Sequence, residues 1–225
     1  MDGRKLGTLC IIDTKPRTFS EEELESLKDL AELAEHELAA VQLATMDELT
    51  GISNRRGFIA LAQNFLGICL RQDIPAALIF LDLNQFKPIN DSFGHAEGDK
   101  ALIAFAKLMK NTFRDSDVFA RIGGDEFVVL LTDTSREAVE EIIERYGHSL
   151  ETYNKKADCG YDISFSYGLV IVDHKQHHSI ETLLSQADCL MYEKKRLRIS
   201  DESRNRVDNN HETMKLSKIE RVSSA

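Results

Sequence analysis

The stretch VFARIGGDEFVVLL, from Val118 to Leu131, decides the fold. Two short apolar runs lie on either side of the glycine pair Gly123 and Gly124, a pattern that predicts a β-hairpin. Upstream, the apolar run from Ala76 to Leu83 is continuous, which is typical of a strand buried on both faces. The hairpin and this strand alternate with helical segments, so we expect an α/β (α+β) chain whose sheet contains an antiparallel pair.

The segments around these strands carry helix signals. Asn54 is a candidate N-cap for a helix that continues to about Arg71, and a second helix has an apolar face formed by Phe105, Leu108 and Met109. The remaining predicted elements are a charged helix that starts near residue 135, a strand over residues 163–172 and a helix over residues 180–196. Helices and strands thus alternate through the central part of the chain.

Residues 20–46 predict one long helix. Ser20 and Glu23 have the spacing of a capping box. Apolar residues then recur at alternating intervals of three and four, as in the seam of a coiled coil: Leu24, Leu27, Ala31, Ala34, Leu38 and Val41. A helix that packs on its own domain has a similar pattern, so a coiled-coil dimer and plain amphipathic packing both stay open. Ahead of this helix, residues 7–13 predict a short buried strand.

Composition and charge exclude several classes of protein. The 225 residues are 42% apolar and 29% charged, which fits a soluble domain of ordinary size with an added element. No apolar run is long enough to span a bilayer, so no membrane insertion is expected. The net charge is −10, and residues 20–48 hold ten acidic side chains and one lysine, a balance of −9. This distribution argues against nucleic-acid binding, which needs clustered Lys and Arg.

The cysteines and the phosphate-binding motifs narrow the choice further. Four cysteines stand far apart without C-x-x-C spacing, which indicates neither a zinc site nor a disulfide framework and favours the cytoplasm. The sequence contains no G-x-x-x-x-G-K-[ST] loop, so a P-loop kinase or GTPase is excluded.

Three carboxylates stand where the predicted strands end. Asp82 follows the apolar run of its strand, and Asp125 and Glu126 come directly after the glycine pair. A strand-end Asp often only hydrogen-bonds the next turn, and a hairpin explains the glycines without any function. If the two strands are neighbours, however, Asp82 and Asp125 converge, and such oxygen ligands hold Mg²⁺ while leaving positions open for substrate phosphates. The pattern therefore indicates a site for a metal and a phosphorylated substrate.

Several motifs follow one another along the chain: DELTGISNRR at 47–56, DLNQFKPIND at 82–91, FGH at 93–95, GD at 98–99 and RIGGDEF at 121–127. In order and spacing they resemble the signature of GGDEF-domain diguanylate cyclases, and the resemblance covers residues 47–207. It implies a ferredoxin-like palm core of the kind found in nucleotide cyclases, behind a long coiled-coil-like helix. It also implies a cytoplasmic bacterial enzyme, a nucleotidyltransferase that condenses two GTP molecules into cyclic di-GMP and two pyrophosphates.

The resemblance assigns the metal and catalytic roles. The implied cofactor is Mg²⁺, with Mn²⁺ as a substitute. Its ligands would be Asp82, the Leu83 carbonyl and Asp125, with Glu126 close by. The catalytic residues would be Asp125, Glu126 and Lys87, and the lysine would supply a positive charge to the triphosphate.

The resemblance also implies a substrate-binding set: Asn90, Asp99, His95, Phe86 and Lys195. Asn90 and Asp99 match the guanine-binding pair. A carboxylate suits this role because it accepts hydrogen bonds from both N1–H and the N2 amine of guanine, which adenine lacks. Read structurally, Asp99 would instead cap the helix after Gly98.

Dimerisation and product feedback follow from the same resemblance. One chain holds one GTP and the product joins two, so a homodimer is implied, and the long helix would align its two half-sites. Arg114 and Asp117 match the R-x-x-D site at which the family binds its product as an inhibitor, with Arg145 as a further contact. Their alternative reading is a surface charge pair. For the whole chain, the alternative function is a catalytically silent GGDEF module that acts as a c-di-GMP receptor.

The predicted domains and the departures from the family pattern complete the expectations. Residues 1–19 resemble the end of a GAF sensory domain, 20–46 form a signalling helix, 47–207 form the GGDEF domain, and 208–225 are a polar tail expected to be disordered. Asn84 replaces an often acidic residue, and Pro88 is unusual but tolerated in a first helical turn. The C-terminal basic motif arrives late, which puts a role for Arg204 in doubt.

Overall fold

The computed structural model describes residues 7–173 and 179–196. Its elements are α1 (Glu21–Thr45), α2 (Arg55–Gln72), β1 (Ala76–Leu83), α3 (Phe86–Phe93), α4 (His95–Thr112), β2 (Val118–Arg121), β3 (Glu126–Thr132), α5 (Arg136–Ala157) and β4 (Phe165–Ile171). Residues 180–196 form a further helix. None of the helices in these ranges is long and apolar enough to cross a membrane. The predicted domain end at 207, Arg204 and the tail 208–225 lie outside the described residues.

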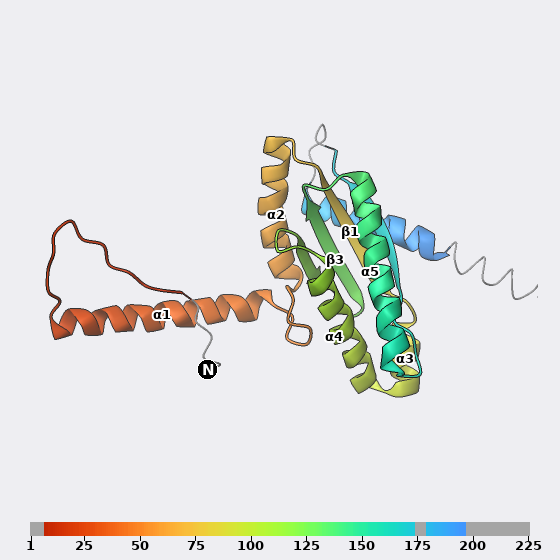
Figure 1. Cartoon of the computed structure of the whole chain (residues 1–225), viewed down its shortest axis with the longest axis horizontal. Coiled ribbons are helices and arrows are strands. Elements are labelled where there is room, and N and C mark those ends of the chain that lie inside the picture. Colours follow the sequence, from red (N-terminus) through yellow and green to blue (C-terminus); the bar gives the residue numbers. More distant parts are fainter. Residues whose placement is uncertain (1–6, 174–178, 197–225) are drawn as a thin grey trace, which may run out of the picture.

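The four strands form one antiparallel sheet in the order β2-β3-β1-β4. Along the chain, β1 is followed by α3 and α4, then by β2, β3, α5 and β4, which is the connectivity of a ferredoxin-like fold. The predicted hairpin consists of β2 and β3, and Arg121 pairs with Phe127 beside the glycine turn. The predicted fold class is therefore confirmed, including the long helix that Figure 1 shows as an arm leaving the domain.

Side chains alternate between two cores, one on each face of the sheet. On one face, Ile79 of β1 belongs to the core built with α4 and α5. On the other face, Phe80 of β1 and Val128 of β3 belong to the core built with α2 and helix 180–196. Asp82 lies two residues after Phe80, and Glu126 lies two residues before Val128. Both acids therefore point toward the α2 face of the sheet.

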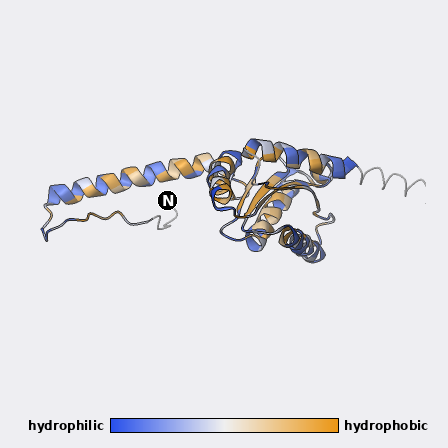
Figure 2. Cartoon of the chain, turned by 90° about the horizontal axis from the view of Figure 1, so that it is seen from above, coloured by the Kyte–Doolittle hydropathy of each residue, from blue (hydrophilic) through white to orange (hydrophobic). Residues whose placement is uncertain are grey.

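Helix α1 begins as predicted but buries none of its side chains. Ser20 and Glu23 form the expected capping box. The seam residues are largely exposed, with 45% of Leu24, 49% of Leu38 and 55% of Val41 accessible to solvent. Figure 2 shows apolar and polar segments alternating along this arm. The arm therefore offers an apolar stripe that its own domain does not cover.

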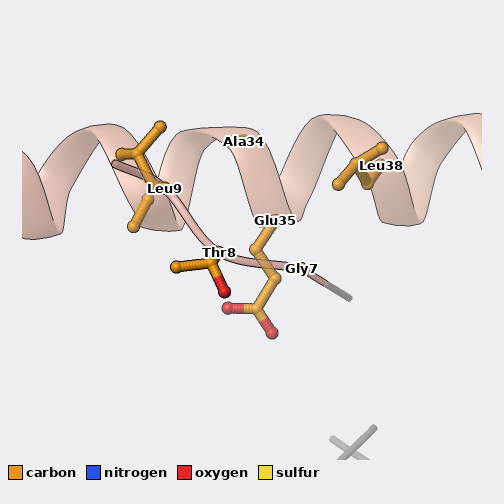
Figure 3. Close-up of a pocket in the computed structure, with 7 residues that line it drawn as sticks. Gly7, Thr8, Leu9, Ala34, Glu35 and Leu38 are labelled. Atoms are coloured by element: carbon orange, nitrogen blue, oxygen red, sulfur yellow. The ribbon is translucent and has the colours of Figure 1, made fainter. Parts of the chain in front are cut away.

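The strand predicted for residues 7–13 does not form, so this prediction is wrong. The segment is exposed, and Figure 3 shows Gly7, Thr8 and Leu9 running alongside α1, where they line a shallow pocket with Ala34, Glu35 and Leu38. A strand needs a neighbour to pair its backbone N–H and C=O groups, and none of the described strands runs beside this segment. The resemblance of residues 1–19 to the end of a GAF domain stays a prediction without a strand to support it.

Helices α1 and α2 meet at Asn54, which is the predicted N-cap of α2. The Asn54 Oδ1 accepts a hydrogen bond from the Gly57 N–H at 3.0 Å, and its Nδ2 donates to the carbonyl oxygens of Ala44 and Met46 at 3.1 and 3.0 Å. A Cβ atom on Gly57 would lie 2.3 Å from the Thr45 carbonyl oxygen, so only glycine allows the two helices this close. One amide side chain therefore caps α2 and holds the end of α1.

Candidate active site

The predicted acidic residues meet where β1 ends and the antiparallel β3 begins. Asp82 and Glu126 are register partners across these strands. The Leu83 backbone N–H donates to the Asp125 carbonyl oxygen at 3.0 Å, which fixes the last residue of the glycine turn against the end of β1. The side chain of Asp82 is only 13% exposed. The structure therefore brings together all four residues that the sequence assigned to the metal site.

Negative charge accumulates at this end of the sheet. Burial raises the pKa of the Asp125 carboxyl, and the charge of Asp82 raises it further. Burial also raises the pKa of Glu126, and Asp188, Asp125 and Asp82 add to the effect. Carboxylates whose pKa is raised by burial and by one another bind a cation readily, because the cation removes both penalties.

One such cation is Lys195, which the sequence assigned to the substrate phosphates. It lies on helix 180–196, and its Nζ is 2.5 Å from Asp82 Oδ1. Lys195 therefore lies at the predicted metal site, beside the predicted ligand Asp82. Among the described residues, no group of three or more His, Cys, Asp or Glu side chains is arranged to hold a metal. Two carboxylates and a carbonyl nevertheless fit Mg²⁺, which usually keeps several waters and takes its other oxygens from substrate phosphates.

The glycine pair has a different role at each position. Neither Gly123 nor Gly124 has a positive φ angle, so the turn does not need glycine for its backbone conformation. A Cβ atom on Gly123 would lie 2.1 Å from Glu126 Oε2, whereas one on Gly124 would meet nothing within 4 Å. Gly123 therefore leaves the space in which the Glu126 carboxylate lies, a reason that the hairpin pattern in the sequence did not reveal.

Arg121 and Asp47 support this turn, and sequence reasoning missed both. The Arg121 guanidinium donates to the Gly124 carbonyl oxygen at 2.8 and 3.1 Å and to both Asp47 oxygens at 3.2 Å. Asp47 also accepts from the backbone N–H and hydroxyl of Thr50 at 2.9 and 2.5 Å. The turn after α1 is therefore tied to the glycine turn. The two residues are 74 positions apart, so no local pattern announces their contact.

The predicted guanine-binding pair lies on α3 and α4. A Cβ atom on Gly98 would lie 1.9 Å from Asn90 Oδ1, so the Asn90 amide rests directly on the first turn of α4. Asp99 is the next residue and is exposed. The alternative reading of Asp99 as a helix cap is wrong, because α4 begins at His95 with Gly94 as its N-cap. Asn90 and Asp99 therefore lie at one junction.

The other predicted substrate residues are spread around this junction. Phe86 is half-buried at the start of α3, Lys87 follows it and is exposed, and His95 is exposed at the start of α4. Pro88 lies in the first turn of α3, where proline is tolerated. The exposed side chains of Lys87 and His95 are accessible to a nucleotide.

The unusual Asn84 is a buried structural residue. Its Nδ2 donates to Ser164 Oγ at 3.1 Å, and its Oδ1 accepts from Ser166 Oγ at 2.7 Å. These bonds join β1 to the start of β4. A carboxylate here would place another charge beside Asp82, so the neutral amide limits the repulsion at this end of the sheet.

The three predicted product-site residues also come together. Asp117 Oδ2 accepts from the Arg114 backbone N–H at 2.9 Å, and Arg145 donates to the Thr112 carbonyl oxygen at 3.0 Å. Burial raises the pKa of Asp117, and the charges of Arg114 and Arg145 partly oppose that rise. Asp117 precedes β2 and the glycine turn follows β2, so the two candidate sites lie at opposite ends of one short strand.

Comparison with known sequences identifies relatives over most of the chain. Residues 44–200 match the family model for "Diguanylate cyclase, GGDEF domain". In Escherichia coli, DgcC, named as a probable diguanylate cyclase, is 33% identical over 171 residues, and the diguanylate cyclase DosC is 32% identical over 177 residues. The alignments cover 76% and 79% of this chain but only 46% and 36% of the relatives. The chain thus spans less than half the length of either protein.

Solved structures share the fold. The coiled coil and GGDEF domain of DgcB from Caulobacter crescentus, in complex with c-di-GMP, matches with a TM-score of 0.70 at 23% identity, over 77% of this chain and 92% of that one. The GGDEF domain of YfiN from Pseudomonas aeruginosa matches with a TM-score of 0.62 at 31% identity, over 68% and 89%. With a family model that covers residues 44–200, these matches show that the chain belongs to the GGDEF family of diguanylate cyclases.

Proposed function

We propose that this protein condenses two GTP molecules into cyclic di-GMP, with Mg²⁺ as cofactor and as a homodimer. The observation that carries the proposal is the concentration of half-buried carboxylates where β1 ends and β3 begins, together with the Asn90–Asp99 junction on the two helices that follow β1. A triphosphate needs bound cations, and a guanine needs acceptors for its N1–H and N2 amine. In this proposal, one domain supplies both the cation site and the acceptors for the guanine.

The reaction is a phosphoryl transfer that occurs twice. In each transfer the 3′-oxygen of one GTP bonds to the α-phosphorus of the GTP on the other subunit, and the bond from that phosphorus to pyrophosphate breaks with its electron pair. Bound Mg²⁺ supplies charge neutralisation at the phosphates. Asp82, Asp125 and the Leu83 carbonyl would hold it. Lys87 and Lys195 would add positive charge to the triphosphate.

The proton of the attacking 3′-hydroxyl needs an acceptor within the site. We assign this role to Glu126, with Asp125 beside it. The raised pKa of Glu126 suits a general base, because a carboxylate whose pKa lies nearer to the working pH takes up a proton more readily. Gly123 contributes by leaving the space that this carboxylate occupies.

Dimerisation is proposed through α1. Each chain offers one GTP site, so two copies must face each other to make the two bonds of the product. The exposed apolar stripe on α1 provides the surface for pairing in parallel. The related DgcB structure contains a coiled coil, and this similarity in fold supports pairing through α1.

Product feedback is proposed at Arg114, Asp117 and Arg145. The guanidinium groups would contact the guanine bases and phosphates of c-di-GMP, where a planar fork binds better than an ammonium. Related GGDEF domains, among them that of DgcB, bind c-di-GMP in their solved structures, which supports this proposal.

A direct assay tests the proposal. The protein is incubated with GTP and Mg²⁺, and the nucleotides are separated by chromatography, with the formation of c-di-GMP expected. The Asp125→Asn variant should lose at least about 1,000-fold in rate, because one cation ligand becomes neutral, yet still bind GTP in part through Asn90 and Asp99. Asp162→Asn, a change at an exposed loop residue, serves as the control and should be active.

Two outcomes would contradict the proposal. Full activity in Asp125→Asn would remove the role of the carboxylates in holding the metal. Absence of product from the unmodified protein at high concentration, together with tight binding of c-di-GMP, would instead favour a silent receptor module.

A further inference from the structure

The junction between α3 and α4 is a single glycine with weak local support. Gly94 is both the C-cap of α3 and the N-cap of α4, its φ is +87°, and no side chain caps either end there. The first turn of α4 starts with the bonds from the Glu97 and Gly98 N–H groups to the Gly94 carbonyl oxygen, at 3.1 and 3.3 Å. An N-terminus capped by glycine alone leaves its free N–H groups without a side-chain acceptor.

This junction determines where the proposed guanine contacts lie. Asn90 belongs to α3, and its amide rests on Gly98 of α4. Asp99 follows Gly98 directly. A shift of the first turn of α4 relative to α3 would therefore move the amide and the carboxylate apart, and both are needed to grip one base.

Tyr161 contacts the chain on both sides of this junction. It lies in the loop between α5 and β4. Its hydroxyl lies 3.1 Å from the Glu97 carbonyl oxygen and 3.3 Å from Glu97 Oε2. Its ring packs against Phe93, the last residue of α3, with 5.1 Å between ring centroids. One side chain therefore links the end of α3 to the first turn of α4.

The surroundings keep Tyr161 in place. Gly160 has a φ of +78°, and a Cβ atom there would lie 3.2 Å from Phe93, so the loop approaches α3 closely only with glycine at this position. The Glu97 carboxylate is held from its other side by Lys100 Nζ at 2.7 Å. Burial, and then the neighbouring Cys159 and Glu97, raise the pKa of Tyr161 to about 12, so its hydroxyl stays a hydrogen-bond donor at neutral pH.

We propose that Tyr161 is a positioning residue for base recognition: by joining Phe93 to Glu97 it fixes the α3–α4 junction, so that Asn90 and Asp99 present their acceptors to one guanine. The inference rests on the proposed function of this site. Tyr161 itself touches neither the base nor the phosphates; it acts through the geometry of Gly94 and its neighbours.

The test compares Tyr161→Phe with Tyr153→Phe. Phenylalanine at 161 keeps the ring contact with Phe93 and removes only the hydroxyl that bonds to Glu97. Tyr153 lies on α5 near the same cluster, but no hydrogen bond from its hydroxyl is described, so it is the matched control. Both variants keep the aromatic ring, so both are expected to fold, and thermal melting checks this.

Kinetics with two nucleotides provide the functional readout. Inosine triphosphate lacks the N2 amine, so a site that reads this amine prefers GTP. In Tyr161→Phe, the KM for GTP should rise roughly five-fold, as expected for one hydrogen bond, while kcat stays within about two-fold of the parent and the preference over inosine triphosphate shrinks. Tyr153→Phe should keep both values.

Hydrogen exchange provides a readout that does not depend on activity. The amides of residues 94–98 should exchange faster in Tyr161→Phe than in the parent, and Tyr153→Phe should leave them unchanged. Unaltered exchange at the junction, or a fall in kcat at constant KM, would overturn the positioning role. If the parent protein itself shows no preference for GTP, base recognition by Asn90 and Asp99 fails, and the role of Tyr161 fails with it.

Discussion

The arm and the domain of this protein differ in what holds them. The domain has an apolar core on each face of its sheet, whereas α1 buries none of its side chains. A helix of 25 residues gains most of its stability from packing of an apolar face, and the domain of the same chain does not supply that packing. The domain therefore holds the residues of the candidate site by itself, whereas the apolar face of α1 still needs a surface to pack against.

Among changes that test this comparison of arm and domain, the largest effect is expected at the apolar seam of α1. Leu38→Glu places a charge on the apolar stripe of α1, so two helices would no longer pair closely. At low protein concentration, turnover should fall on the order of 100-fold and recover partly as concentration rises, because pairing sets the effective concentration of the half-sites. Sedimentation velocity should show monomers.

The control for this variant lies on the same helix. Leu43 is 72% exposed and off the seam, so Leu43→Glu should preserve the dimer and the rate. Binding of GTP to a single chain should be the same in both variants, since none of the proposed GTP contacts lies on α1. Normal turnover by dilute Leu38→Glu would show that the domains meet without α1.

A change at Asp47, which lies between α1 and the domain, should have an intermediate effect. Burial would raise the pKa of Asp47, but the hydrogen bonds from Thr50 and the charge of Arg121 outweigh it and leave the pKa below its ordinary value of 3.8. Asp47→Asn should lower the free energy of unfolding by about 2 kcal/mol at neutral pH, because charged hydrogen bonds are lost. Activity should fall as well, since Arg121 would hold Gly124 less firmly.

The pH dependence of this loss has a definite sign. A carboxyl whose pKa is lowered by folding stabilises the protein above its unfolded pKa, and this contribution disappears as pH falls through the lowered value. The stability gap between the parent and Asp47→Asn should therefore be constant above about pH 5 and close below pH 3.8. Urea titrations across this range measure it. Glu48→Gln, at the exposed neighbour, should show no gap at any pH.

The smallest effect on the catalytic rate is expected at the proposed product site. Arg114→Ala should weaken c-di-GMP binding roughly ten-fold while the initial rate with GTP stays unchanged, because the residue lies at the far end of β2 from the carboxylates. The affinity of Arg114→Lys for c-di-GMP should lie between that of the parent and that of Arg114→Ala. Progress curves with added product measure the inhibition. Undiminished inhibition in Arg114→Ala would return Arg114 and Asp117 to the status of a surface pair.

Local patterns predicted the elements of the fold well. The continuous apolar run gave β1, the glycine pair gave the hairpin, and Asn54 was recognised as a cap because capping depends on residues three positions apart. The prediction of a strand at residues 7–13 is wrong because strand formation does not depend on local sequence alone. An apolar run shows a preference for burial, but a strand also needs a partner, and a partner is not a local property.

The candidate site shows the same division. Asp82, Asp125 and Glu126 were predictable from strand ends and motif resemblance, and the structure brings them together. The Asp47 contact with Arg121 and the role of Tyr161 depend on residues far apart in sequence, so they emerged only with the fold. The sequence predicts Lys195 as a substrate-binding residue, and its ion pair with Asp82, 113 positions away, becomes visible only in the fold.

The double cap made by Asn54 has a mechanical consequence. With its amide bonded to both helices and Gly57 pressed against Thr45, the arm has no slack where it enters the domain. At 1.5 Å per residue, α1 is a rod about 37 Å long, clamped at one end. A rotation of the other end of α1 would be transmitted to α2 and, through Asp47, to the turn that carries the glycine pair.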